Sequence, residues 1–158
     1  MESKVPRLIY TLFVGVLISI FVGVGINTFY AEPVQPAYVV TYADKPVEEN
    51  IVQNQEYDKE YTVYTDKSNI YNRNVSIITL TAAVLLMAVS LYYEKKIKVL
   101  ADGVMLGGLF TLIYSIIRGF MSSDSRSVFV IIAAGLICVL FIGYHRFVKA
   151  PKSKKKKR

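Results

Sequence analysis

Two charged residues, Asp102 and Arg118, lie at the two ends of one long apolar segment, a setting in which ionisable groups are costly and often functional. Asp102 follows Lys98 by four residues, so their side chains can pair on one turn of a helix. Because both charged side chains can extend to the edge of an apolar layer, we expect them to anchor an interface. A functional charged site is the alternative.

Polar side chains lie between these two charges, and a polar path along the segment would be lined mainly by Thr111, Tyr114 and Ser115. No common catalytic pattern accompanies them, since the sequence has no HExxH, GxSxG or phosphate-binding loop. The single histidine, His145, and the single cysteine, Cys138, exclude His and Cys metal clusters and an internal disulfide. We therefore expect no enzyme, no cofactor and no metal site.

A basic cluster follows the last apolar segment and consists of Lys154, Lys155, Lys156, Lys157 and Arg158. Such a cluster beside a membrane helix holds its end in the cytoplasm and attracts anionic lipid by about 1 kcal/mol per basic residue. We expect anionic membrane lipids as partners of this tail. The net charge of +7 then has a topological cause, and we expect no nucleic acid partner.

The elements that position these residues are four apolar segments, at 8–29, 75–93, 99–117 and 128–144. A membrane-spanning helix needs about 17 to 25 apolar residues, and all four segments fit that window. A soluble core would instead alternate apolar and polar residues with a helical or strand period. For a chain of 158 residues, the pattern predicts an all-α fold, an integral membrane four-helix bundle.

The first apolar segment begins directly after Lys4 and Arg7, as the apolar region of a signal peptide would. Its 22 residues exceed the about 7 to 15 residues of such a region. Cleavage after Ala31 would place Phe29 at a position that needs a small residue. We therefore expect an uncleaved membrane anchor.

Charge sets the expected orientation in the cell membrane. Of the 19 lysine and arginine residues, 13 lie before residue 8, between residues 94 and 98, or after residue 145. Basic residues collect in cytoplasmic loops, so both termini are expected to be cytoplasmic. The segment 30–72 is then extracytoplasmic, with eight acidic residues and three lysines.

The extracytoplasmic segment divides at Pro46. Three prolines between residues 30 and 46 oppose a helix there, which predicts an extended linker. After Pro46 the chain has no glycine until Gly103 and no proline until Pro151. We therefore predict a long extracytoplasmic helix that is continuous with the second membrane helix.

Tyrosines recur on this predicted helix with a heptad-like spacing typical of a coiled coil, at Tyr57, Tyr61, Tyr64 and Tyr71. Tyrosine joins an apolar ring to a polar tip, which suits a half-wet contact surface. The face is a candidate interaction surface for a protein partner or a second copy. A marginal helix that folds against the linker, and a disordered acidic loop, are the alternatives.

The predicted organisation follows directly, and the boundaries are as follows: cytoplasmic N-terminus 1–7, membrane helix 8–29, linker 30–45, amphipathic helix 46–72, membrane helix 73–93, basic inner loop 94–98, membrane helix 99–118, outer loop 119–127, membrane helix 128–146 and cytoplasmic tail 147–158.

Small residues recur every four positions in two of the membrane helices. The first helix carries Gly15, Ser19 and Gly23, and the third carries Gly103, Gly107, Thr111, Ser115 and Gly119. Membrane helices associate through such faces because their backbones can approach closely there. We expect both stripes to pack against other helices, with Gly108 outside the stripe.

Two stretches, FVGVGINTFYAEP at 21–33 and LGGLFTLIYSIIRGF at 106–120, resemble uncharacterised small four-helix membrane proteins of candidate phyla radiation bacteria. The resemblance implies a first helix that ends in a proline-containing turn, and then a charged, Tyr-rich outer segment. It implies no activity.

The most economical functional hypothesis is a non-enzymatic membrane protein of structural or interaction type that displays an acidic, Tyr-rich helix. A protein partner or a homo-oligomer would occupy that helix. A small oligomeric transporter or channel component is the alternative, and it would use Thr111 and Ser115.

Overall fold

In a computed structural model, which describes residues 4–37 and 47–148, the described residues form helices and no strand. In chain order these are α1 (Lys4–Phe29), α2 (Val47–Tyr93), α3 (Lys98–Phe120), α4 (Ser125–Gly143) and a short π-helix, η1 (Tyr144–Val148). The predicted all-α class is confirmed for these residues. Four helices are long and apolar enough to cross a membrane.

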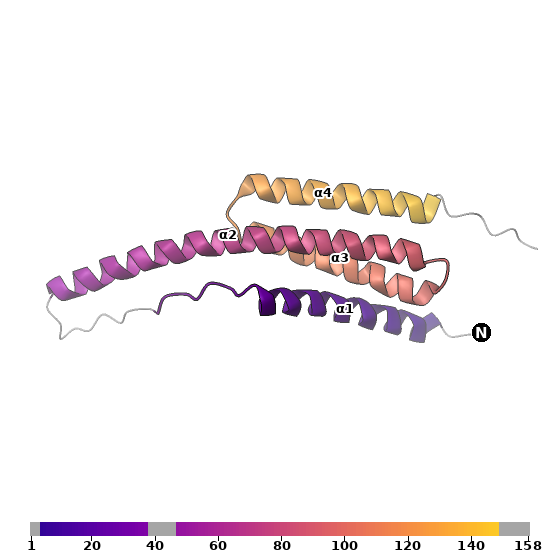
Figure 1. Cartoon of the computed structure of the whole chain (residues 1–158), viewed down its shortest axis with the longest axis horizontal. Coiled ribbons are helices and arrows are strands. Elements are labelled where there is room, and N and C mark those ends of the chain that lie inside the picture. Colours follow the sequence, from indigo (N-terminus) through magenta and orange to yellow (C-terminus); the bar gives the residue numbers. More distant parts are fainter. Residues whose placement is uncertain (1–3, 38–46, 149–158) are drawn as a thin grey trace, which may run out of the picture.

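Consecutive helices run in opposite directions, and α2 and α3 form the central pair (Figure 1). α1 packs mainly on α3, whereas α4 packs on both α2 and α3. α1 and α4 therefore lie on opposite sides of the central pair (Figure 1). Because of this arrangement, α3 is the helix through which the other three are joined.

α1 begins at Lys4, four residues before the predicted start, because Pro6 is tolerated in the first turn of a helix. The helix ends at Phe29, and Tyr30 still donates its backbone N–H to the carbonyl of Ile26. Pro33 cannot supply a helical N–H, so the chain leaves in an extended conformation.

α2 is one uninterrupted helix of 47 residues, about 70 Å long at about 1.5 Å per residue. It contains neither glycine nor proline, which explains its continuity. Its N-terminal half extends past the ends of the other helices, with residues 30–37 of the segment that follows α1 beside part of it (Figure 1). We call residues 47–70 the projection, because no described side chain in 51–70 is buried whereas Tyr71 is.

The connection between α3 and α4 is shorter than the predicted loop 119–127. α3 continues to Phe120, and α4 begins at Ser125 because Asp124 caps it. The Asp124 carboxylate accepts hydrogen bonds from the backbone N–H groups of Arg126 and Ser127. The prediction began this helix at the first apolar residue and missed the cap. At its other end α4 stops at Gly143, and η1 continues to Val148.

Small and hydroxyl-bearing residues line the contact between α2 and α3. Ser76 and Ser115 bond reciprocally, because each hydroxyl donates to the other residue's carbonyl, at 2.5 and 2.7 Å. Further along, the Ser90 hydroxyl donates to the carbonyl of Ala101 at 2.6 Å. All these donors are buried, so each bond joins a side chain of one helix to the backbone of the other where water is excluded.

Candidate functional site

The guanidinium of Arg118, near the end of α3, is the centre of a polar cluster at the base of the projection. Its Nη1 donates to Glu32 at 3.0 Å and to the Asn72 side-chain oxygen at 2.8 Å, and its Nε donates to the Tyr114 hydroxyl at 3.0 Å. We call these four residues the Arg118 cluster. Asn72 is only 2% exposed, so its bond to Arg118 satisfies a buried polar group.

Aromatic rings extend this cluster to the segment after α1. The rings of Tyr30 and Tyr71 stack with centroids 5.0 Å apart, and the Arg118 guanidinium lies 5.5 Å from the Tyr71 ring centroid. Asn74 donates to the Tyr30 hydroxyl at 3.1 Å. Such stacking and cation–π contacts add to the hydrogen bonds. The base of the projection is therefore held to the segment after α1 and to α3.

Asp102 forms a second cluster near the start of α3. One carboxylate oxygen accepts from Arg7 of α1 at 3.1 Å, and the other accepts from Arg146 of η1. Arg146 also pairs with Glu94 at 3.5 Å. A pair between Asp102 and Lys98 is not among the described contacts, so that interpretation of their spacing is wrong. Lys98 precedes Asp102 on the same helix, whereas the two arginines approach from other helices and are closer to its carboxylate.

The π-helix explains why Arg146 can reach this cluster. Its side chain is only 8% exposed, so an unpaired guanidinium there would be costly. A π-turn adds a residue to each turn and redirects the side chains that follow, and such turns recur at functional positions. In η1 the redirected Arg146 points at both Asp102 and Glu94.

Three of the four predicted tyrosines form a ladder along the projection. The ring centroids of Tyr57 and Tyr61 are 5.9 Å apart, and those of Tyr61 and Tyr64 are 6.0 Å apart. Tyr61 is 44% exposed. Tyr71 does not belong to this surface, because it is 3% exposed and stacks on Tyr30. The heptad spacing could not indicate where the projection ends and the bundle begins.

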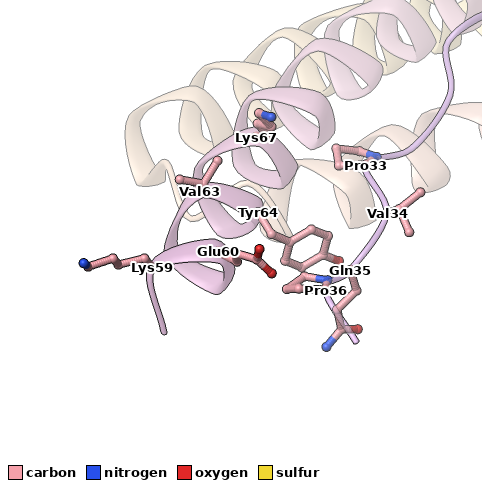
Figure 2. Close-up of a pocket in the computed structure, with 9 residues that line it drawn as sticks. All are labelled: Pro33, Val34, Gln35, Pro36, Lys59, Glu60, Val63, Tyr64 and Lys67. Carbon is pink, nitrogen blue, oxygen red and sulfur yellow. The ribbon is translucent and has the colours of Figure 1, made fainter. Parts of the chain in front are cut away.

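The segment after α1 covers one side of the projection (Figure 2). Pro36 lies beside the Tyr64 ring and Pro33 lies further along the segment, and both line an open groove of about 580 Å³. The rest of the lining consists of Val34 and Gln35 of the segment and of Lys59, Glu60, Val63 and Lys67 of α2. Contact between the helix and the linker, one of the alternatives, is therefore present at Tyr64, whereas Tyr61 stays exposed.

The small residues of α3 divide between two neighbouring helices. A methyl group at Gly103 would lie 2.8 Å from Val14 of α1, and one at Gly107 would lie 2.9 Å from Ile18. Ser115 bonds to Ser76 of α2 instead, and Gly119 lies near the same serine. Four residues turn a helix about 40° beyond a full circle, so a four-residue stripe moves from one neighbour to the next.

Thr111 lies between these two halves of the stripe. It is 1% exposed, and its hydroxyl donates to the carbonyl of Gly107 one turn earlier. The hydroxyl groups of Thr111 and Ser115 therefore both donate to backbone carbonyl groups.

The three predicted packing residues of α1 have different surroundings. Gly15 is buried against Leu106 of α3, whereas the Ser19 hydroxyl bonds to the carbonyl of Val16 in its own helix. A methyl group at Gly23 would meet no atom within 4 Å, so the expectation that Gly23 packs on another helix is wrong. α1 and α3 are close at Gly15 and diverge toward Gly23.

Gly108, expected to lie outside the packing stripe, is buried in the contact between α2 and α3. A methyl group there would lie 2.7 Å from Met87 and 3.2 Å from the carbonyl oxygen of Ala83. Adjacent residues point about 100° apart, so Gly107 and Gly108 face different helices. Both therefore allow close approach.

The predicted tail cluster, Lys154, Lys155, Lys156, Lys157 and Arg158, lies outside the described residues. Within residues 4–37 and 47–148, no three His, Cys, Asp or Glu side chains gather in a way that could hold a metal ion.

Sequence reasoning missed Arg7, Glu32, Asn72 and Arg146 as partners in the two charged clusters. Charge offered one signal, because Glu32 follows the first apolar segment and Arg118 ends the third, which places opposite charges at one end of a bundle. No sequence signal indicated that Arg146 turns back toward Asp102, since that depends on η1.

Comparison of the chain with protein-family models, with curated proteins and with solved structures gives no match, so the resemblance to small membrane proteins of candidate phyla radiation bacteria stays a prediction.

Proposed function

We propose that this chain is a non-enzymatic, multi-pass protein of the cell membrane that displays the projection outside the cytoplasm as a docking surface. The observation that carries the proposal is the sharp change in burial along α2. No described side chain in 51–70 is buried, and burial begins at Tyr71. A helix that served only to cross the membrane would have no need of the additional 24 residues, about 36 Å in length.

The two charged clusters support membrane insertion of the bundle. Asp102 and Arg118 are 16 residues apart on α3, about 24 Å along the helix axis. The hydrocarbon core of a bilayer is about 30 Å thick. Both clusters therefore fall near its two edges, where charged side chains can extend toward water.

Charge asymmetry supports the proposed orientation. The Arg118 cluster and the acidic projection lie at one end of the bundle, and the Asp102 cluster lies at the end where α1 and α3 begin (Figure 1). Basic loops at the second end agree with a cytoplasmic location.

Cysteine labelling tests the orientation. Ser68→Cys and Ser153→Cys, each in a Cys138→Ala background, should react with an impermeant maleimide from the outside and from the inside of cells, respectively. Labelling of both positions from the same side would exclude four spans with both termini in the cytoplasm.

Tyr61, which is 44% exposed and lies between the rings of Tyr57 and Tyr64, supports the docking role, because tyrosine rings offer a large, rigid contact area at low entropic cost. We expect Tyr57→Ser, Tyr61→Ser and Tyr64→Ser together to abolish cross-links formed through Asp58→Cys and to reduce the mass of the complex in mild detergent. Membrane insertion should stay unchanged.

Tyrosines at the other end of α2 provide the matched control. Tyr92 and Tyr93 also contact each other, with centroids 5.3 Å apart, and Tyr92 is 70% exposed. Their replacement by serine should leave the cross-links intact. Unchanged cross-links and mass in the ladder variant would instead reduce the ladder to local packing of one helix.

A small oligomeric transporter or channel component is less well supported. Thr111 and Ser115, the polar residues that such a path would use, are buried and donate to backbone carbonyl groups. Neither hydroxyl is free to line a path within the described bundle.

A further inference from the structure

An open groove lies between α1 and α3, beneath the Arg118 cluster. Its volume is about 470 Å³, and its walls include Ile20, Val24 and Phe110, with Arg118 and Glu32 at one end. The groove exists because the two helices touch at Gly15 and diverge toward Gly23, where a methyl group would meet nothing within 4 Å. Ile20 and Val24 are exposed, so the groove is open on the outer side of the bundle.

The charged end of the groove carries two groups of opposite sign. The Nη2 group of Arg118 donates to no described residue, although the side chain is only 15% exposed. A phosphate oxygen is the acceptor that best matches such a free guanidinium edge. The carboxylate of Glu32, 3.0 Å from Nη1, is 43% exposed and can take a second cation.

We infer that this groove binds one zwitterionic, amine-bearing phospholipid of the outer leaflet, such as phosphatidylethanolamine. Its phosphate pairs with Arg118 and its ammonium group with Glu32. One acyl chain follows the apolar walls from Arg118 to Phe110, eight residues and about 12 Å along α3. The inference rests on the proposed membrane insertion and is independent of the tyrosine ladder.

Charge complementarity selects this lipid over an anionic one. A headgroup with a phosphate alone would satisfy Arg118 but would place a negative charge beside Glu32. A headgroup with both charges satisfies both residues. A second copy of this chain would have to offer the same pair of charges from a helix in the groove, and that outcome is included in the test.

The test uses the full chain reconstituted in nanodiscs of equal parts phosphatidylethanolamine and phosphatidylglycerol, followed by native mass spectrometry of retained lipid. Gly23→Leu fills the groove where a side chain has room, so the fold should survive and lipid retention should fall about tenfold. Gly25→Leu is the matched control, because Gly25 also has open surroundings but does not line the groove. It should retain lipid as the wild type does.

Headgroup variants test the charge assignment. Arg118→Gln should lower retention of both lipids by about tenfold. Glu32→Gln should keep total retention and reduce the preference for phosphatidylethanolamine by about threefold. Arg126→Gln, an exposed arginine at the start of α4, should change neither quantity.

Three results would overturn the inference. The first is equal lipid retention by the Gly23→Leu and Gly25→Leu proteins. The second is a preference for phosphatidylglycerol that is the same in the wild type and in Glu32→Gln. The third is a change in oligomer mass with Gly23→Leu while lipid retention is constant. The last result would assign the groove to a second copy. If the wild type were absent from the membrane fraction of cells, membrane insertion itself would fail, which distinguishes the two proposals.

Discussion

Replacement of Gly107 by leucine should separate α1 from α3 and leave the contact between α2 and α3 in place. A β-carbon at Gly107 would lie 2.9 Å from Ile18 Cβ and 3.2 Å from the carbonyl oxygen of Gly15. Carbon atoms in contact are normally about 3.5–4.0 Å apart, so the helices must move apart by up to about 1 Å for that atom alone. The remaining leucine carbons increase the displacement, and overpacking of this kind costs about 1–3 kcal/mol.

Accessibility of single cysteines can report which contact opens. Val14→Cys, in a Cys138→Ala background, lies against Gly103 and is half-buried, so it should react with maleimide in detergent faster when α1 is displaced. Ala83→Cys lies on the fully buried face of α2 and should stay protected in the Gly107→Leu protein.

The neighbouring glycine provides a converse experiment. Leucine at Gly108 would clash with Met87 and with the backbone of α2, so it should expose Ala83→Cys and not Val14→Cys. Gly25→Leu should leave both cysteines protected and the melting temperature unchanged, because nothing lies within 4 Å. If Val14→Cys were equally protected in the Gly107→Leu and Gly25→Leu proteins, with equal melting temperatures, close approach of α1 and α3 would not require glycine.

Three further predictions concern the polar contacts. Asp102→Asn should destabilise the protein in detergent by about 2 kcal/mol, because it leaves a nearly buried arginine short of a charged partner, whereas Lys98→Ala should have no effect on the melting temperature. Ser76→Ala and Ser115→Ala should each cost about 1 kcal/mol, and a double-mutant cycle should show coupling since the two residues bond reciprocally. The pKa of Asp124 is held below its usual value by the hydroxyl and backbone N–H of Ser127, so its cap is intact at neutral pH and is lost only as the pH falls through that lowered pKa. Hydrogen exchange at the start of α4 should rise over that range, and Asp124→Asn should remove the pH dependence.

The lengths and apolar composition of the helices could be predicted from the sequence, because they depend on residues that are neighbours in the chain. A run of about 20 apolar residues indicates a spanning helix wherever it lies. The unbroken course of α2 follows in the same way from the absence of glycine and proline between residues 47 and 93. Even the start of α4 could be read from Asp124 and the serine three residues later, a capping pattern that the apolar boundary concealed.

The partners within the clusters were decided by the tertiary structure alone. Arg7 and Asp102 are 95 residues apart in the chain, and Glu32 and Arg118 are 86 apart. Charge pairing over such separations depends on which helices become neighbours and on how they are shifted along their axes. Neither property is encoded in local spacing. The choice of Arg7 over Lys98 for Asp102 is the clearest case.

The tertiary structure also divided patterns that appear uniform in the sequence. The small residues of α3 serve two helices because a four-residue repeat rotates about 40° per step around a helix of 3.6 residues per turn. Tyr71 leaves the tyrosine ladder because the bundle begins there, and Gly23 opens a groove because α1 diverges from α3. A repeat in the chain determines which residues share a face, but only the packed helices determine what that face meets.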